Sequence, residues 1–472
     1  MEQYDLIVIG AGPGGYVAAI RASQLGMRVA VIEKRASLGG VCLNEGCIPS
    51  KALLDSSEHF AMARDSFSRH GIEIEPPRLN LRAMQDRKDG VVKRLTDGVA
   101  FLFKKNKITL FQGRAVLKGS DQDGHHQVEV LAEQISGPAA LLVAPRILLA
   151  TGSEAATLPH IPFDGHLVVS AQEALCFDQV PEHLVVAGGG YIGLELGSVW
   201  RRLGARVTVL EMLPRLLPAM DRQVSDLLQR SLKKQGIEFR FGARVSGLRR
   251  VGNRGLVQIT SDSEVDEIDC DRLLVAIGRR PVLQGLGFME LGGSLSDDGR
   301  IVVDQSYQTT VSGIYAVGDL IPGPMLAHKA SEEAVVCVER MAGRTSCVEY
   351  QYLPGVIYTW PQGASVGKTE EQLQQDTIPY KTGRFNFLGN GRARAMDATD
   401  GFVKVLAHAE SDLLLGVHIV GPHASEMIAE AVTAMGLMGT SEHIGKQFHA
   451  HPTLSEAFKE AALDVHGDAI HS

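Results

Sequence analysis

The sequence predicts an α/β protein that contains two Rossmann-like dinucleotide-binding domains. A glycine-rich turn between a strand and a helix opens the chain, and the same arrangement recurs after residue 180. The length of 472 residues exceeds what a single hydrophobic core serves, and about three domains are expected. Two of these domains are accounted for by the two turns, which leaves enough chain for a third.

Residues 5–33 form the first dinucleotide-binding unit. An apolar strand over residues 5–9 leads into the glycine turn, a helix-like stretch and a second strand that ends on Glu33. The glycines of this turn are Gly10, Gly12, Gly14 and Gly15. They permit a tight turn and the close approach of a pyrophosphate, and the helix N-terminus supplies amide donors. Glu33 is placed to accept hydrogen bonds from a ribose. A mere glycine-rich turn is the alternative, but it would not require the flanking strand, helix and acid.

The second unit repeats this order from residue 183 onwards. Its turn contains Gly188, Gly190 and Gly193, and its second strand ends on Glu211. The first glycine and the terminal acid are 23 positions apart in both units. The chain is therefore expected to use two dinucleotides, one held and one exchanged.

Glu211 also bears on the choice between nicotinamide cofactors. A 2′-phosphate would repel this carboxylate and would call for an arginine nearby. Met212 follows directly, and the first arginine is Arg215. NAD is therefore favoured over NADP, although Arg215 could fold back towards the ribose.

Two further apolar strands run out into polar turns. One ends in Thr151 and Gly152, and the other ends in Gly318 and Asp319. Ligands of open α/β sheets bind at the carboxyl ends of strands. Either stretch alone reads as an ordinary turn. Together with the opening fingerprint they suggest a flavin domain assembled from separated pieces of chain.

Cys42 and Cys47 stand apart from the other four cysteines, which are scattered singly and read as small buried residues. Positions five apart in an ideal helix lie about 8.6 Å apart between Cα atoms, whereas a disulfide needs less than about 7 Å. A bridge would thus require a distorted turn, which Gly46 permits. Pro49 suits an early helical position, so Cys47 is expected near a helix N-terminus that lowers its thiol pKa. Chance proximity and a metal site are the alternatives. No metal is expected, because two cysteines are too few ligands.

Composition excludes several classes of protein. A formal charge of −8 argues against a nucleic-acid-binding protein. No apolar run is long enough to span a bilayer, so membrane insertion is not expected. The N-terminus has neither a signal peptide nor a transit segment, which favours a cytoplasmic protein; a mature organelle protein remains an alternative.

The cysteine segment GGVCLNEGCIPSKALL resembles the redox motif of the pyridine nucleotide–disulfide oxidoreductases, most closely of those members that oxidise dihydrolipoyl groups. The resemblance extends over essentially the whole chain. It includes the strings LLVAIGRRP, GIYAVGDL, MLAHKA, PGVIYTWPQGASVG, NGRARAMDATDGFVKVL and HAHPTLSEAF, in the expected order.

The resemblance implies tightly bound FAD and exchangeable NAD, with a redox-active Cys42–Cys47 disulfide. Cys42 would exchange with the substrate and Cys47 would contact the flavin. Lys51 would lie beside the flavin and pair with Glu195. FAD contacts are expected from Gly10, Gly12, Gly14, Gly15, Glu33, Lys51, Gly113, Ala115, Thr151, Gly152, Asp319, Met325, Ala327 and His328. NAD contacts are expected from Gly188, Gly190, Gly193, Glu211, Val245 and Gly278.

A histidine is the natural proton carrier near neutral pH, and a thiol must lose its proton before it attacks a disulfide. The resemblance selects His451, with Glu456 as the carboxylate that orients it; His449 is the alternative. In the family this segment reaches across a dimer interface, so His451 of one subunit would serve Cys42 of the other.

The resemblance also implies an architecture and partners. We expect an FAD-binding domain at 1–149, an NAD-binding domain at 150–278, a central segment at 279–345 that completes the FAD site, and an α+β dimerisation domain at 346–472. The expected partners are a second copy of the chain and lipoyl-bearing acyltransferases or glycine-cleavage carrier proteins. Glutathione- and mercury-reducing members are the rivals within the family, and a purely structural partner is the rival outside it. Glu211 argues against the glutathione-reducing members, which use NADP, and the lack of a C-terminal cysteine pair argues against the mercury-reducing members. The intact Cys42–Cys47 motif argues against a purely structural role.

Overall fold

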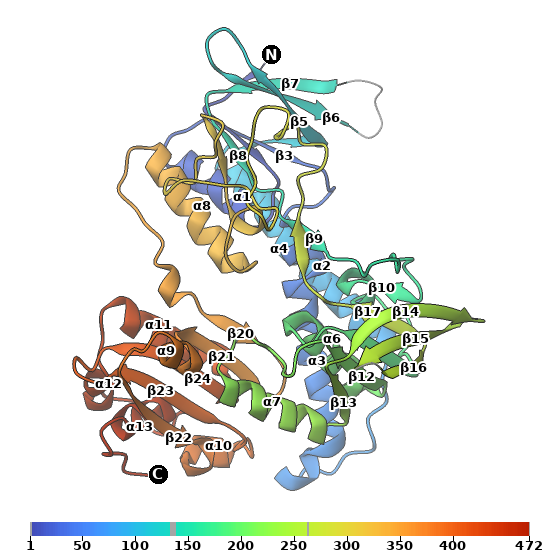
Figure 1. The fold of residues 1–472 in the computed structure, drawn as a ribbon, viewed down its shortest axis with the longest axis vertical. Coiled ribbons are helices and arrows are strands. Elements are labelled where there is room, and N and C mark those ends of the chain that lie inside the picture. The colour runs from blue at the N-terminus through green and yellow to red at the C-terminus, as the bar shows by residue number, and fades with distance from the viewer. Residues whose placement is uncertain (1, 133–137, 262–263, 472) are drawn as a thin grey trace. The chain divides into compact units, whose positions relative to one another are not determined.

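The computed structural model describes residues 2–132, 138–261 and 264–471 (Figure 1). The chain divides into two compact units. Unit 1 consists of Met1–Leu53, Leu81–Ala156 and Gly278–Val348, and unit 2 consists of Leu54–Asn80, Thr157–Ile277 and Glu349–Ser472. Each unit contains a parallel sheet with helical crossovers, which confirms the predicted α/β class with two Rossmann-like folds.

Unit 1 is built on a five-stranded parallel sheet in the order β19-β8-β2-β3-β4. These strands are β2 (Leu6–Ile9), β3 (Val29–Glu33), β4 (Thr109–Gln112), β8 (Ile147–Leu149) and β19 (Ile314–Ala316). β2 and β3 are buried along their whole length, as is typical of strands with both faces covered. β8 pairs with both β2 and β19, so the two separated polar turns come to one edge of the sheet. The prediction that the stretches ending in Gly152 and Asp319 belong to the same domain as the first glycine turn is confirmed.

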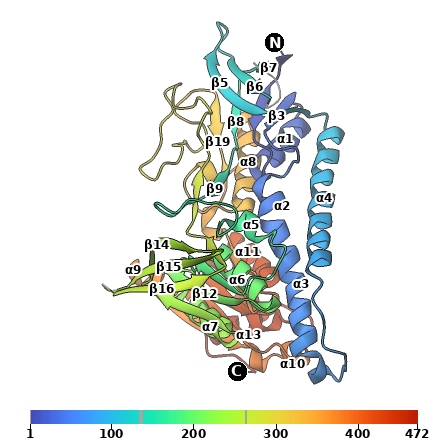
Figure 2. The same ribbon diagram turned by 90° about the vertical axis from the view of Figure 1, so that its right-hand side faces the viewer.

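The helices of unit 1 pack on this sheet through α1, which contacts β2 and β3. α1 packs against α8, and α2 packs against the long α4 (Figure 2). Their bounds are α1 (Pro13–Gln24), α2 (Gly40–Glu45), α4 (Leu81–Lys105), α8 (Ala327–Met341) and η2 (Gly318–Leu320). α3 (Cys47–Asp65) begins in unit 1 and ends in unit 2.

Two smaller sheets complete unit 1. A four-stranded sheet has the order β1-β7-β6-β5, and β9 pairs with β18. The strands are β1 (Glu2–Gln3), β5 (Arg114–Ser120), β6 (His126–Leu131), β7 (Pro138–Ala144), β9 (Ser153–Ala155) and β18 (Arg279–Pro281). The β9–β18 ladder is antiparallel and ties the segment after Gly152 to the segment after Gly278.

The first part of unit 2 repeats the parallel architecture in the order β10-β17-β11-β12-β13, beside a three-stranded antiparallel sheet, β14-β15-β16. The strands are β10 (Val168–Val169), β11 (His183–Ala187), β12 (Arg206–Glu211), β13 (Ile237–Phe241), β14 (Arg244–Val251), β15 (Arg254–Ser261), β16 (Glu264–Cys270) and β17 (Arg272–Val275). The helices are η1 (Phe67–His70), α5 (Ala171–Ala174), α6 (Tyr191–Leu203) and α7 (Arg222–Lys234).

The C-terminal part of unit 2 contains a five-stranded antiparallel sheet in the order β20-β21-β24-β23-β22. The strands are β20 (Gly355–Ile357), β21 (Gln362–Gly367), β22 (Tyr380–Asn386), β23 (Phe402–His408) and β24 (Leu414–Gly421). The helices are η3 (Tyr350–Tyr352), α9 (Glu370–Gln375), η4 (Phe387–Gly389), α10 (Gly391–Ala395), α11 (Ala424–Gly436), α12 (Ser441–Lys446) and α13 (Glu456–Asp464). α11 and α13 pack on this sheet and bury one continuous apolar core.

Among the residues that the structure describes, no helix combines the length and apolarity needed to cross a membrane.

Candidate active site

The glycines of the first turn serve two different purposes. A Cβ at Gly10 would lie 2.4 Å from the carbonyl oxygen of Ala150, and a Cβ at Gly15 would lie 1.8 Å from the Gly10 carbonyl oxygen. These two glycines are therefore required by the close packing of strand and helix. Gly12 is different, because the nearest atom to its Cβ would be the Gly40 Cα at 3.9 Å.

The second turn shows the same division. A Cβ at Gly188 would lie 2.4 Å from the Ala276 carbonyl oxygen, and a Cβ at Gly193 would lie 2.3 Å from the Gly188 carbonyl oxygen. Gly190 has no atom within 4 Å of such a Cβ. The middle glycine of each turn thus lies where chain packing does not demand it. This is the cradle that a pyrophosphate at a helix N-terminus needs, so both turns fit a dinucleotide.

The acids at the ends of β3 and β12 are bound to the turns in the same way. Glu33 accepts hydrogen bonds from the Ala11 N–H at 2.7 Å and the Arg35 N–H at 2.9 Å. Glu211 accepts from the Gly189 N–H at 2.7 Å and the Leu213 N–H at 2.8 Å. A carboxylate has about four acceptor positions, so each acid can still receive a ribose hydroxyl. The sequence did not reveal that these acids also form hydrogen bonds to backbone amides of the turns.

Arg215 is engaged away from Glu211. Its guanidinium donates a hydrogen bond to the Pro218 carbonyl oxygen at 2.7 Å. Met212, the residue that follows Glu211, is exposed. The hydrogen bonds that the Glu211 carboxylate accepts come from the backbone amides of Gly189 and Leu213.

Cys42 and Cys47 lie on two helices separated by Gly46. α2 ends at Glu45, Gly46 adopts φ −141° and ψ −110°, and α3 begins at Cys47. The predicted interruption is present, but Cys42 lies within a helical turn, which the sequence did not indicate. Gly39, with φ +94°, is the N-cap of that short helix. The side chains of Cys42 and Cys47 are in hydrogen-bond contact as thiols.

The electrostatic surroundings of the two thiols differ. The hydrogen bond to Cys47 and burial both raise the pKa of the Cys42 thiol, and the nearby Lys51 ammonium only partly opposes them. Cys47 is exposed and is the first residue of α3, where the helix dipole stabilises an anion. Burial and the contact with Cys47 therefore disfavour a thiolate at Cys42.

The turn at Asp319 is fixed by a polar network within unit 1. Ser153 donates a hydrogen bond to the Asp319 carboxylate at 2.5 Å. The Gly318 N–H donates to Glu333 at 2.8 Å, and the Gly318 carbonyl accepts from Lys329 at 3.1 Å. Lys329 and Glu333 form a fully buried ion pair at 2.9 Å. Sequence reasoning missed this pair, for which the sequence offered no signal beyond the spacing of Lys329 and Glu333.

The remaining residues predicted to contact FAD lie in unit 1. Thr151 donates to the Val282 carbonyl oxygen at 2.7 Å, and the Gly113 N–H donates to the Glu33 carbonyl oxygen at 2.9 Å. Ala115 lies on β5, Ala327 and His328 are the first residues of α8, and Met325 lies two residues before that helix. For NAD, Val245 lies on β14 in unit 2, whereas Gly278 opens the last stretch of unit 1. These contacts remain predictions.

His451 and Glu456 form a hydrogen-bonded pair at the start of α13. Nδ1 of His451 lies 2.9 Å from the Glu456 carboxylate, which also accepts the Thr453 N–H at 2.8 Å. Burial would raise the pKa of Glu456, but the hydrogen bonds from Thr453 and His451 outweigh it and lower the pKa. The charged carboxylate holds the proton on Nδ1, so Nε2 is the nitrogen that can accept a proton.

His449 has a carboxylate partner too. Its Nε2 lies 2.8 Å from Glu430, and the hydrogen bond to that carboxylate raises the His449 pKa. Exposure separates the two histidines, because the side chain of His449 is 5% exposed and that of His451 is 78% exposed. Only His451 is open to a partner molecule.

Glu195, predicted to pair with Lys51, is buried on α6 and accepts a hydrogen bond from the Tyr358 N–H at 3.0 Å. Lys51 belongs to unit 1 and Glu195 to unit 2, and their pairing remains a prediction.

Known proteins place the chain in one family. Residues 4–334 match the model of the pyridine nucleotide-disulphide oxidoreductases, and residues 353–462 match the dimerisation domain of that family. Dihydrolipoyl dehydrogenase 3 of Pseudomonas aeruginosa is 48% identical, with all of both chains covered. The mitochondrial dihydrolipoyl dehydrogenase of Pisum sativum is 45% identical over all of this chain and 93% of its own.

A solved structure agrees with these relatives. The crystal structure of LpdA from Mycobacterium tuberculosis has a TM-score of 0.90 at 25% identity, and the match covers 98% of this chain and 99% of that one. The family match spans more than half of the chain, and the two glycine turns, the contacting cysteines and the histidine–glutamate pair all lie within it. The chain belongs to the pyridine nucleotide-disulphide oxidoreductase family.

Proposed function

We propose that this chain is an FAD-containing, NAD-dependent dihydrolipoyl dehydrogenase, which oxidises protein-bound dihydrolipoamide to lipoamide and reduces NAD⁺ to NADH. The observation that carries the proposal is the contact between Cys42 and Cys47 at the start of α3, in the same unit as the first glycine turn. Relatives that bear this name and align along the whole chain support it.

FAD is assigned to unit 1. Gly12, Glu33, Asp319 and Lys51 would hold it, together with the other unit 1 residues predicted above. When bound, FAD supplies the two-electron transfer between the cysteine pair and the nicotinamide. The protein contributes the cradle at Gly12, the carboxylate network at Asp319 and the position of the thiols beside Lys51.

NAD is assigned to the second turn, in preference to NADP. The Glu211 carboxylate and the exposed Met212 offer no cation for a 2′-phosphate, and Arg215 is bound to the Pro218 carbonyl. Two ribose hydroxyl groups would instead find an acceptor in Glu211.

The thiol chemistry follows from the asymmetry of the pair in its oxidised, disulfide form. Nε2 of His451 removes a proton from one substrate thiol, and the thiolate attacks the Cys42 sulfur. The Cys42–Cys47 bond breaks and Cys47 leaves as a thiolate. The second substrate thiol then closes the lipoyl ring and displaces Cys42. Of the two substrate protons, one ends on Cys42 and the other on His451.

The partners and location are part of the same proposal. A homodimer is supported by the match to the family's dimerisation domain, and His451 of one subunit would serve Cys42 of the other. The dihydrolipoyl group would be carried by an acyltransferase or a glycine-cleavage carrier protein in the cytoplasm. The exposed face of His451 suits a substrate that arrives on another protein.

A steady-state assay with purified holoenzyme tests the proposal. NADH formation from dihydrolipoamide and NAD⁺ is expected to exceed the reduction of glutathione disulfide by NADPH by orders of magnitude. A Cys42→Ser enzyme should lose lipoyl turnover and retain NADH-dependent quinone reduction, which needs no cysteine pair. Comparable rates with NADPH and glutathione disulfide in the unaltered enzyme would contradict the proposal.

A further inference from the structure

The loop that follows Glu211, residues 212–221, packs against the second glycine turn. The Leu217 N–H donates a hydrogen bond to the Gly189 carbonyl oxygen at 3.2 Å. Leu216 is buried, and its Cδ2 lies so close to Gly189 that a Cβ there would approach it to 2.6 Å. Because Glu211 itself accepts the Gly189 N–H, the acid, the loop and the turn form one connected piece.

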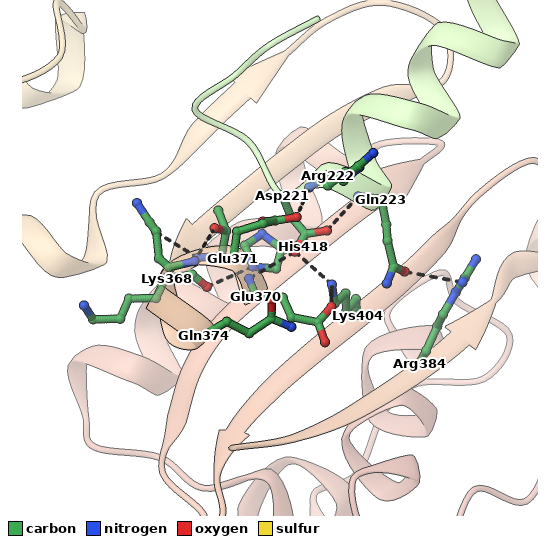
Figure 3. Close-up of polar contacts among 12 residues, drawn as sticks. Asp221, Arg222, Gln223, Lys368, Glu370, Glu371, Gln374, Arg384, Lys404 and His418 are labelled. Atoms are coloured by element: carbon green, nitrogen blue, oxygen red, sulfur yellow. Dashed lines mark hydrogen bonds and ion pairs between the residues drawn. The ribbon is translucent and has the colours of Figure 1, made fainter. Parts of the chain in front are cut away.

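Asp221 anchors the far end of this loop. It is fully buried, and one carboxylate oxygen caps α7 by accepting the Gln223 N–H at 3.0 Å. The other oxygen accepts from the Lys404 ammonium at 2.8 Å and from the Glu370 N–H at 3.3 Å (Figure 3). The carboxylate therefore joins the start of α7 to β23 and α9, which belong to the C-terminal part of unit 2.

Lys404 has no role in the thiol or dinucleotide chemistry described above, yet it is a fully buried cation. It extends from β23 and also binds the Glu370 carboxylate at 2.6 Å. The neighbouring Glu371 accepts the Arg222 N–H at 3.2 Å, so α9 binds the loop end at two consecutive residues. Lys404, Glu370 and Glu371 all belong to the stretch that matches the family's dimerisation domain.

Asp221 and Lys404 are both fully buried, so the removal of Lys404 leaves Asp221 without its main counter-charge. A buried carboxylate without its cation is strongly disfavoured and tends to move towards water. Without Lys404, the Asp221 side chain would turn outwards and carry the end of the loop with it. The displacement would reach Gly189 and Glu211 through Leu216 and Leu217.

We infer that Asp221 and Lys404 are positioning residues for the nicotinamide dinucleotide, through which the dimerisation domain fixes the loop beside Glu211. This inference rests on the proposed function, because it assumes that NAD binds at the second glycine turn. Neither residue needs to touch the dinucleotide. They act through the loop on Gly189 and Glu211, which lie where the dinucleotide is expected to bind.

Holoenzyme with Lys404→Met tests the inference. This change keeps an unbranched side chain, one heavy atom shorter, and removes its charge. The KM for NAD⁺ and the Kd for NADH are expected to rise at least about fivefold, a typical coupling between linked sites. The kcat at saturating NAD⁺, the KM for dihydrolipoamide and the FAD content should stay unchanged. The double variant Asp221→Asn/Lys404→Met should recover part of the affinity, because it leaves no buried charge alone.

Asp376→Asn is the matched control. Asp376 pairs with Lys368 at 2.6 Å near the same helix, but both side chains are about half exposed, so its removal should leave the KM for NAD⁺ unchanged. If Lys404→Met yields no holoenzyme, Asp221→Asn carries the same expectation, because asparagine retains the helix cap.

A folded Lys404→Met or Asp221→Asn enzyme with an unchanged KM for NAD⁺ would overturn the inference, as would an equal rise in the KM for both substrates. Failure of the proposed function has a different signature, since it would appear as an unaltered enzyme that does not bind NADH at all.

Discussion

The two cysteines are chemically unequal before any substrate arrives. In thiol–disulfide exchange, the sulfur with the lower thiol pKa leaves more readily. The helix N-terminus stabilises a Cys47 thiolate, whereas burial and the contact with Cys47 raise the pKa of Cys42. In the proposed reaction we therefore expect the substrate thiolate to attack Cys42, with Cys47 as the leaving group. The direction of exchange follows from where each residue sits on its helix.

His418 makes the stability of the protein depend on pH. Burial lowers the pKa of this fully buried imidazole below its usual 6.5, although Asp221 partly opposes the shift. Nε2 already binds the Lys368 carbonyl, and among the described residues Nδ1 has no partner, so a second N–H would be unsatisfied. The unfolded chain takes up this proton below about pH 6.5 and the folded chain does not. Stability is therefore complete above that pH and declines as the pH falls.

The expected loss from His418 is at most about 1.4 kcal/mol between pH 6.5 and 5.5. Thermal unfolding of the original protein and of His418→Asn at pH 7.5 and 5.5 measures it, because the difference between the two proteins removes the contribution of other groups. An equal drop in Tm for both proteins would show that His418 does not contribute.

At the scale of the elements, the two glycine turns predict two kinds of variant. Gly193→Ala would place a Cβ 2.3 Å from the Gly188 carbonyl and should lower the free energy of unfolding by about 1–3 kcal/mol. Gly190→Ala meets no atom within 4 Å, and as a change at a helix N-cap it should cost no more than about 1 kcal/mol. NADH affinity should nevertheless fall for Gly190→Ala, because the methyl group enters the cradle.

Calorimetric Tm values and NADH titrations separate these two effects. Gly197→Ala serves as a control within the same helix, since its Cβ would meet only ordinary side-chain contacts at 3.4 Å or more. If Gly190→Ala bound NADH as tightly as the original protein, the second turn would not be the dinucleotide cradle.

The sequence predicted the elements whose signals are local. Both strand–turn–helix units could be located from the spacing of glycines and terminal acids. The short helix that carries Cys42 was missed because it depends on the left-handed conformation of Gly39. Lys404 and Asp221 are 183 positions apart, and no local pattern marks their contact. The Lys329–Glu333 pair was overlooked because its burial depends on the packing of α8 against α1.

At the scale of the whole molecule, the residues proposed for the thiol chemistry belong to two compact units. Cys42 and Cys47 belong to unit 1, and His451 and Glu456 belong to unit 2. His451 is bound to Glu456 yet largely exposed, and it lies in the stretch that matches a dimerisation domain. A symmetric dimer with two identical contacts would give each Cys42 a histidine from the other subunit.

Mixed dimers test this arrangement. Cys42→Ser and His451→Gln homodimers should each lose lipoyl turnover and retain NADH-dependent quinone reduction. When the two chains are co-expressed with different tags, a hybrid dimer combines both defects in one site and leaves the other site intact. Random assembly should therefore restore about a quarter of the original lipoyl activity, all of it in the doubly tagged fraction. If His451 served the Cys42 of its own chain, every site in the hybrid would contain one defect. The doubly tagged fraction would then be as inactive as either homodimer, and an active site shared between subunits would have to be abandoned.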